Sequence, residues 1–126
     1  MTLRILLVED NELNRDMLSR RLLRANYQVS TAADGAAALQ LIREQRPDVV
    51  LLDMNLPIKD GWTTCREVRQ DPSIAGTAII ALTAHAMGED RVKAMEAGCN
   101  DYATKPVDFP KLLEAINRLA PEADQT

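Results

Sequence analysis

The spacing of hydrophobic residues predicts an alternation of strands and helices along the chain. Short stretches rich in apolar or β-favouring residues are predicted strands at 3–8, 27–31, 49–52, 77–82 and 101–104. Apolar residues at helical spacing, or runs rich in Ala and Leu, predict helices at 13–23, 36–45, 62–70, 87–97 and 109–119. Breaks between these segments are marked by Pro47, Pro72, Gly76 and Gly98.

Regular alternation of strand and helix predicts an α/β fold with one parallel, doubly wound sheet, because right-handed crossovers permit little else. We expect a flavodoxin-like five-stranded sheet of order 2-1-3-4-5 with five helices. The first helix has a predicted apolar face and a predicted basic face. The apolar face is made of Leu13, Met17, Leu18, Leu22 and Leu23, and the basic one of Arg15, Arg20, Arg21 and Arg24.

The stretch from Asp48 to Gly61 is the centre of this arrangement. Val49 to Leu52 form an apolar run without polar alternation, typical of a strand that helices cover on both faces. Asp53 follows at once, and Pro57 and Gly61 then favour a loop. Open α/β sheets place their sites at the carboxyl ends of strands, so Asp53 is a candidate functional residue. It equally fits a residue that caps the strand or the turn.

Length and composition indicate one ordinary globular domain over residues 1–126, with a polar tail at 121–126. The net charge of −4 argues against a nucleic-acid partner, which requires a basic face. The short apolar stretch near the N-terminus and the absence of a long one predict neither a signal peptide nor a membrane span. Cys65 and Cys99 lack the close spacing of a metal or redox motif, so we interpret them as small buried side chains in a reduced, cytoplasmic protein.

Polar residues follow four of the predicted strands, at the edge where the carboxyl ends of a parallel sheet meet. They are Glu9, Asp10, Asp53, Thr83 and Lys105. Crowded carboxylates repel unless a cation offsets them, and Mg²⁺ suits a site of carboxylates, water and phosphate. Lys105 and Thr83 offer donors to phosphoryl oxygens, and an aspartate can accept a phosphoryl group covalently. Taken singly, Lys105 also fits an ordinary salt bridge and Thr83 a helix cap.

The same residues are similar to a known family. The acidic pair Glu9-Asp10, Asp53 within Leu-Leu-Asp-Met-Asn-Leu-Pro, Thr83-Ala84 and Lys105-Pro106 resemble the motifs of receiver domains of two-component response regulators. The resemblance covers residues 3 to 119 and includes the single-domain chemotaxis type. It implies that Asp53 is the phosphoacceptor and that Asp10 and Asp53 bind Mg²⁺ directly. It further implies that Asn55 binds through its backbone carbonyl and Glu9 through water.

The resemblance also implies roles for the residues around the acceptor. The Lys105-Pro106 bond is cis in the family and aims Lys105 at the phosphate. Phosphorylation draws Thr83 inward and lets the aromatic at Tyr102 turn in behind it, although Tyr102 also fits a static interface residue. Small Ala84 leaves room at the phosphate. Asn55 and His85 occupy positions that tune dephosphorylation, although a single histidine is more often an ordinary surface or core residue.

These implications favour a phosphorelay switch that catalyses only its own phosphorylation and dephosphorylation. The expected phosphodonor is a sensor histidine kinase or a histidine phosphotransfer protein, which docks on the first helix at Arg15, Arg20 and Arg24. This basic face equally fits an ordinary solvated surface. The expected output is a protein target that binds around the last two helices, with no nucleic acid and no membrane.

Three alternative functions compete with this interpretation. A haloacid-dehalogenase-type phosphatase requires an acid two residues after the nucleophile, where Asn55 stands. A flavin module requires a phosphate loop after the first strand, where Glu9 and Asp10 stand. The chain could also be the receiver piece of a hybrid histidine kinase, although its Met start and polar tail favour a free-standing protein.

Overall fold

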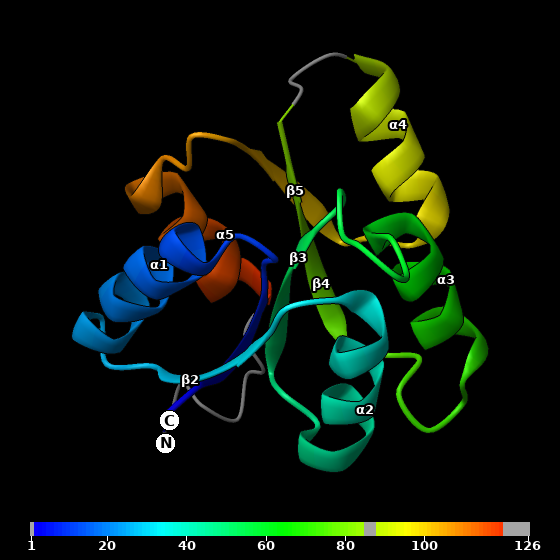
Figure 1. Cartoon of the computed structure of the whole chain (residues 1–126), viewed down its shortest axis with the longest axis horizontal. Coiled ribbons are helices and arrows are strands. Elements are labelled where there is room, and N and C mark those ends of the chain that lie inside the picture. The colour runs from blue at the N-terminus through cyan, green and yellow to red at the C-terminus, as the bar shows by residue number, and fades with distance from the viewer. Residues whose placement is uncertain (1, 85–87, 120–126) are drawn as a thin grey trace.

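A parallel sheet of five strands forms the centre of the molecule (Figure 1). The computed structural model describes residues 2–84 and 88–119. The strands lie in the order β2-β1-β3-β4-β5, which confirms the flavodoxin-like topology expected from the sequence. Their bounds are Arg4–Val8 for β1, Gln28–Ala32 for β2, Val49–Asp53 for β3, Ala78–Thr83 for β4 and Asp101–Thr104 for β5.

The helices form a layer on each face of the sheet. Figure 1 shows α1 and α5 on one face and α2, α3 and α4 on the other. Within the described residues the helices span Glu12–Arg24 for α1, Gly35–Gln45 for α2, Gly61–Gln70 for α3, Gly88–Ala97 for α4 and Phe109–Leu119 for α5. The two layers enclose two hydrophobic cores, one on each side of the sheet.

Strand β3 is the most deeply buried part of the sheet. It pairs in parallel with β1 on one side and β4 on the other, and each of its residues is buried. Val50 and Leu52 pack into the core under α2, α3 and α4, while Leu51 packs into the core under α1 and α5. Burial on both faces explains the unbroken apolar run in the sequence. It also fixes Asp53 at the end of a rigid strand.

Helix caps begin α1 and α3 directly after the loops at this edge. Asn11 caps α1, its side chain accepting a hydrogen bond from the backbone N–H of Asn14. Asp60 caps α3 in the same way through Thr63. Both caps satisfy backbone donors that the first turn of a helix leaves without partners. The two loops that flank the acidic residues are thereby held between a strand end and a capped helix.

The predicted apolar face of α1 is largely wrong. Leu13 is 67% exposed, and Met17 and Leu23 are each 54% exposed, whereas Leu22 is fully buried and Leu18 half-buried. The spacing of the leucines identified a helix correctly. Because α1 lies on the sheet along only one side, its remaining apolar residues face outward.

Some expectations lie outside the described residues. These include His85, the start of the fourth helix at Met87 and the polar tail at 121–126. Among the residues that are described, none of the helices has the length and apolar character needed to cross a membrane.

Candidate functional site

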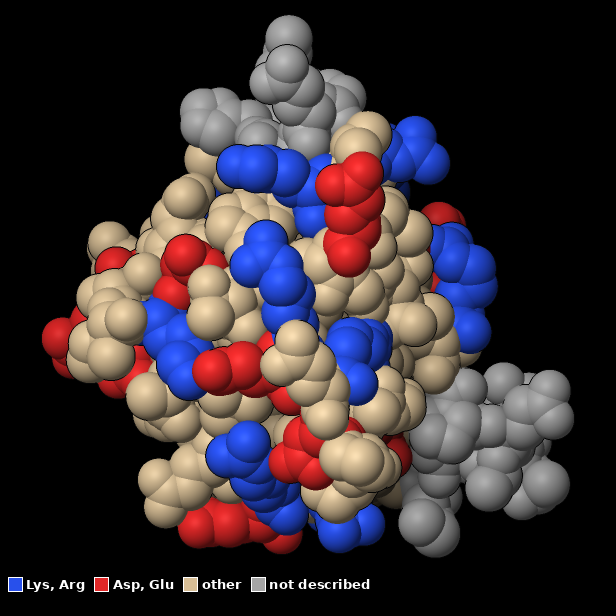
Figure 2. Space-filling view, turned by 90° about the vertical axis from the view of Figure 1, so that its right-hand side faces the viewer, with Lys and Arg blue, Asp and Glu red and all other residues tan. Residues whose placement is uncertain are grey.

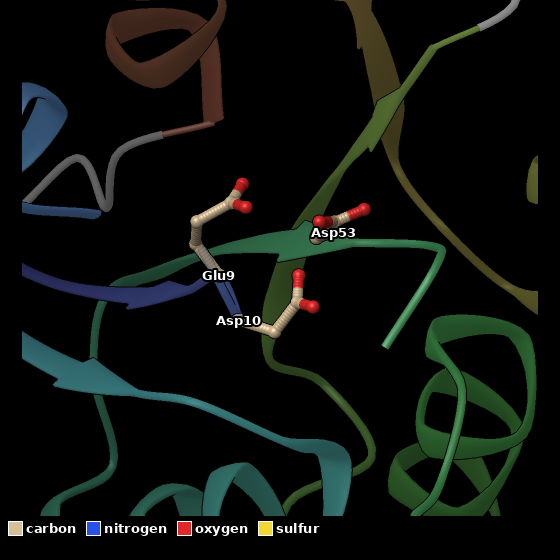
Figure 3. Close-up of side chains that lie close together, drawn as sticks. All are labelled: Glu9, Asp10 and Asp53. Atoms are coloured by element: carbon tan, nitrogen blue, oxygen red, sulfur yellow. The ribbon is translucent and has the colours of Figure 1, made fainter. Parts of the chain in front are cut away.

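Three carboxylates meet where β1 and β3 end. Glu9 and Asp10 follow β1, and Asp53 is the last residue of β3. One carboxylate oxygen from each lies within 4.8 Å of the others, and Figure 3 shows the three side chains gathered at this edge. Glu9 is 4% exposed and Asp53 2% exposed, whereas Asp10 reaches solvent. This cluster of carboxylate oxygens at the carboxyl ends of the strands fits a hard divalent cation that keeps part of its hydration shell.

Lys105 supplies the positive charge nearest to these carboxylates. Its Nζ lies 2.9 Å from Asp53 Oδ2 and 2.9 Å from Glu9 Oε2. Burial alone lowers the pKa of Lys105, but the hydrogen bonds to Asp53 and Glu9 outweigh it, so its pKa lies above the usual value. The amine is therefore protonated and holds the two buried carboxylates together.

The backbone around Lys105 fixes where the amine points. The backbone N–H of Lys105 donates to the carbonyl of Thr83 over 2.8 Å, which continues the pairing of β5 with β4. The Lys105-Pro106 peptide bond is cis, as the family resemblance implied. Thr83 ends β4, is 3% exposed, and follows Leu82, the residue paired with Asp53. Thr83 at the end of β4 and Lys105 just after β5 therefore lie on the same side of Asp53, because β4 and β5 both come after β3 in the sheet order.

The loop after Asp53 is tied back to the acceptor carboxylate. The backbone N–H of Asn55 donates to Asp53 Oδ1 over 3.0 Å, while the Asn55 residue is exposed. The backbone N–H of Gly61 donates to the Met54 carbonyl over 3.0 Å and closes the loop. The two oxygens of Asp53 thus have different partners, the Asn55 amide on one and the Lys105 amine on the other.

Tyr102 lies on β5, two strands away from the acceptor on β3. It is half-buried on β5, pairs in register with Ala81, and packs against the core under α2, α3 and α4. The guanidinium of Arg91 on α4 lies 5.5 Å from the centre of its ring, within the range of a cation–π contact. Sequence reasoning missed Arg91, since only the packing of α4 on β5 brings the two side chains together. Ala84 follows Thr83 and is exposed.

Arg15 does more than contribute to a basic face. Its Nη1 donates to the backbone carbonyl of Glu9 over 2.9 Å, so Arg15 supports the acidic loop directly. Arg20 instead pairs with Asp16 on the surface of α1, and Arg24 is exposed at the end of the helix. The basic face expected from the sequence therefore separates into a side chain at the site and others away from it.

A groove of about 510 Å³ lies beside Lys105, between α1 and the loop that leads to α5. Met17, Leu18 and Arg21 line it from α1, opposite Pro106 and Val107. The sequence offered a partial signal for this groove, since Met17 and Leu18 stand out as apolar residues next to arginines. It did not show that this apolar surface borders the acidic site.

The sheet order defines a flavodoxin-like domain, and its acidic cluster with Lys105 lies at the carboxyl ends of the strands. The chain belongs to the response regulator receiver domain family, whose model matches residues 5–117. It is therefore a receiver domain of a two-component system.

Individual relatives support the assignment. The chain is 38% identical to the response regulator PleD of Caulobacter vibrioides over 94% of its own length, but it spans only 26% of PleD. It matches the receiver domain of the sensor histidine kinase PA1611 of Pseudomonas aeruginosa, crystallised with magnesium in its active-site cleft. The TM-score is 0.87 at 38% identity, over 94% of this chain and 98% of that one.

A further similar structure is the receiver domain of Ssk1 from Saccharomyces cerevisiae in complex with the histidine phosphotransfer protein Ypd1. The TM-score is 0.88 at 29% identity, over 97% of this chain and 91% of that one.

Proposed function

We propose that the chain is a phosphorelay switch, phosphorylated on Asp53 by a sensor histidine kinase or a histidine phosphotransfer protein. The observation that supports this most directly is the site itself. Glu9, Asp10 and Asp53 bring oxygens within 4.8 Å of one another, and Lys105 lies 2.9 Å from two of them. Acid clustering at a strand end, offset by a single amine, is suited to phosphoryl transfer and to few other reactions.

Mg²⁺ is the cofactor of this proposal. Asp10 and Asp53 are its direct ligands, Asn55 offers its backbone carbonyl, and Glu9 acts through water. The donor set is all oxygen and partly open to solvent, which fits Mg²⁺ better than a soft metal. Bound there, the ion neutralises charge on the phosphoryl oxygens during transfer. The magnesium-bound receiver domain of PA1611 is consistent with such a site.

The residues of the chain have distinct tasks in the transfer. A carboxylate oxygen of Asp53 forms the new O–P bond while the P–N bond to the donor histidine breaks in line with it. Lys105, already beside Asp53, shifts its hydrogen bonds to a phosphoryl oxygen and neutralises charge. The Thr83 hydroxyl donates to another phosphoryl oxygen, and Ala84 leaves space for it. Water later attacks the same phosphorus, and Asn55 and His85 set how quickly it does so.

Phosphorylation then changes a surface that binds a protein target. As the Thr83 hydroxyl moves inward, Tyr102 turns in behind it, and the surface of α4, β5 and α5 changes with it. The half-buried place of Tyr102 on the strand next to Thr83 supports this step. We propose that this cytoplasmic domain, residues 1–126, turns over no other substrate. The alternative is that the chain is the receiver domain of a hybrid histidine kinase.

The first test is phosphorylation by a small-molecule donor. We expect wild-type protein, incubated with acetyl phosphate and Mg²⁺, to gain the mass of a single phosphoryl group. Asp53→Asn should gain none, because its amide is a poor nucleophile, and a chelator should also prevent the gain in wild type. Intact-mass spectrometry measures all three. An adduct on Asp53→Asn would move the acceptor elsewhere, and no adduct together with no Mg²⁺-induced change in Trp62 fluorescence would overturn the proposal.

Donor docking provides a second test, at Arg15. We expect Arg15→Glu to slow transfer from the cognate phosphodonor by about 10-fold, because the reversed charge meets the donor surface. Arg15 also holds the Glu9 carbonyl, so acetyl phosphate uptake should fall too, but by less than about 3-fold. Stopped transfer reactions followed by mass measure both rates. Arg66→Glu, at an exposed arginine of α3 in the other helix layer, is the matched control. Equal slowing with both donors would remove the docking role.

A further inference from the structure

The two cysteines of the chain meet in the core, away from the acidic site. Cys65 lies in α3, and Cys99 lies between the end of α4 and the start of β5. They are 34 residues apart in sequence, yet their Sγ atoms are 3.5 Å apart, with the thiol of Cys99 donating to Cys65. Both are buried and reduced. They lie beneath the layer of α2, α3 and α4, the side of the molecule seen in Figure 2.

A fixed guanidinium lies next to this pair. Arg69 follows Cys65 by one turn of α3, and its Nε donates to the carbonyl of Gly98 over 2.8 Å. Its Nη2 donates to Asn100 Oδ1 over 2.8 Å. Arg69 is therefore hydrogen-bonded to Gly98 and Asn100, the residues on either side of Cys99. Further bonds to the carbonyls of Ala75 and Thr77 hold the arginine in place.

The surroundings of Cys65 lower the pKa of its thiol. The hydrogen bond from Cys99 lowers the pKa of Cys65 against the effect of burial, and the charge of Arg69 acts in the same direction. The hydrogen bond to Cys65 and burial together raise the pKa of Cys99. A thiolate is the nucleophilic form of cysteine, and a second thiol in contact can resolve its oxidised product.

We propose that Cys65 and Cys99 form a reversible intramolecular disulfide when the protein meets a peroxide. The Cys65 thiolate attacks hydrogen peroxide, so that an S–O bond forms, the O–O bond breaks, and a proton from solvent completes the released water. The Cys99 sulfur then attacks the sulfur of the resulting sulfenic acid, so that the S–S bond forms and the S–O bond breaks. The leaving hydroxyl takes up the thiol proton of Cys99 and departs as a second water. Two thiols are oxidised and one peroxide is reduced to two waters.

The proposed disulfide would link α3 covalently to the segment that follows α4. Sulfur atoms in a disulfide are about 2.05 Å apart, so the pair closes by roughly 1.5 Å, shared between two rotatable side chains. Cys99 is followed within three residues by Tyr102 on β5, so the cross-link ties down the segment that leads into that strand. The chemistry uses none of the acidic residues, and it stands apart from the proposed phosphorylation.

The test counts thiols after peroxide treatment of the folded protein. Wild-type protein is incubated with hydrogen peroxide and then unfolded in urea with iodoacetamide. Its intact mass is measured by mass spectrometry. We expect both alkylatable thiols to disappear and dithiothreitol to restore both. After proteolysis, the joined peptides of Cys65 and Cys99 should have lost two hydrogen atoms and gained no oxygen, whereas oxygen on the exposed Met17 and Met95 does not count. The oxidised protein should also melt at a higher temperature than the reduced one, because the cross-link restricts the unfolded chain.

Single-cysteine variants separate a specific disulfide from general oxidation. Cys65→Ser and Cys99→Ser, each checked for folding by circular dichroism, should form no intramolecular disulfide and show no peroxide-dependent rise in melting temperature. Asp53→Asn should behave as wild type, so a failure of phosphorylation leaves this result unaffected. Wild type that keeps two alkylatable thiols, or whose Cys65 and Cys99 peptides gain oxygen instead of being joined, would overturn the proposal and leave Cys65 and Cys99 as packing residues.

Discussion

Lys105→Met is expected to reduce phosphorylation of Asp53 by acetyl phosphate by about 100-fold or more, the usual scale for losing a charge-stabilising donor. The amine is the nearest fixed positive charge to the acceptor, 2.9 Å from Asp53 Oδ2. Methionine fills similar space and cannot donate to a phosphoryl oxygen. Intact mass against time, at saturating Mg²⁺, gives the rate. A variant that phosphorylates at the wild-type rate would remove Lys105 from the proposed chemistry.

The same substitution should also lower the free energy of unfolding, because the acidic cluster then lacks its positive charge. Without Lys105, the buried Glu9 and Asp53 lose their shared partner, and we expect a loss of roughly 3 kcal/mol in the free energy of unfolding. This is the low end of the range for broken buried pairs, since the Lys105 side chain is 27% exposed. If Mg²⁺ binds these carboxylates, it should raise the melting temperature of Lys105→Met more than that of wild type. Lys111→Met, an exposed lysine on α5, is the control and should change neither quantity.

The topology could be predicted because its signals are local and repeated. Each strand and helix has its own pattern, and the parallel order follows from their alternation, so β3 could be placed mid-sheet from an apolar run alone. The site followed from the same rule. Residues at the ends of strands converge whatever their separation in sequence, which brought Lys105 to Asp53 across 52 positions.

What escaped prediction depends on how elements pack. Helical spacing gave α1 an apolar stripe, but Leu13 and Met17 face outward because the sheet covers only one side of the helix. Cys65 and Cys99 lack a motif, and only the approach of α3 to the end of α4 brings their sulfurs together. Arg15 shows the same limit, since its bond to the Glu9 carbonyl depends on the path of a single loop.

Gly61 links the stability of the fold to the geometry of the acceptor. A Cβ at this position would lie 2.5 Å from the Asp53 carbonyl oxygen and 2.6 Å from the Met54 Cα. Both are backbone atoms, which cannot turn aside as a side chain could. Gly61 has no left-handed φ, so the loss of stability in Gly61→Ala comes only from the steric clash of the added Cβ. We expect a loss of about 2–3 kcal/mol in unfolding free energy, the upper part of the range for overpacking.

Gly76→Ala is the matched control for this substitution, because a Cβ there would meet nothing within 4 Å. It should leave the stability unchanged or raise it by up to about 1 kcal/mol, since alanine restricts the unfolded chain. Urea unfolding of the two variants beside wild type gives the comparison. Relief of the Gly61 clash shifts the backbone at Asp53 or Met54, so we expect Gly61→Ala also to slow phosphorylation, while Gly76→Ala does not. Equal stability of the two variants would show that the loop from Asn55 to Asp60 yields freely, and the acceptor would then not be held rigidly from that side.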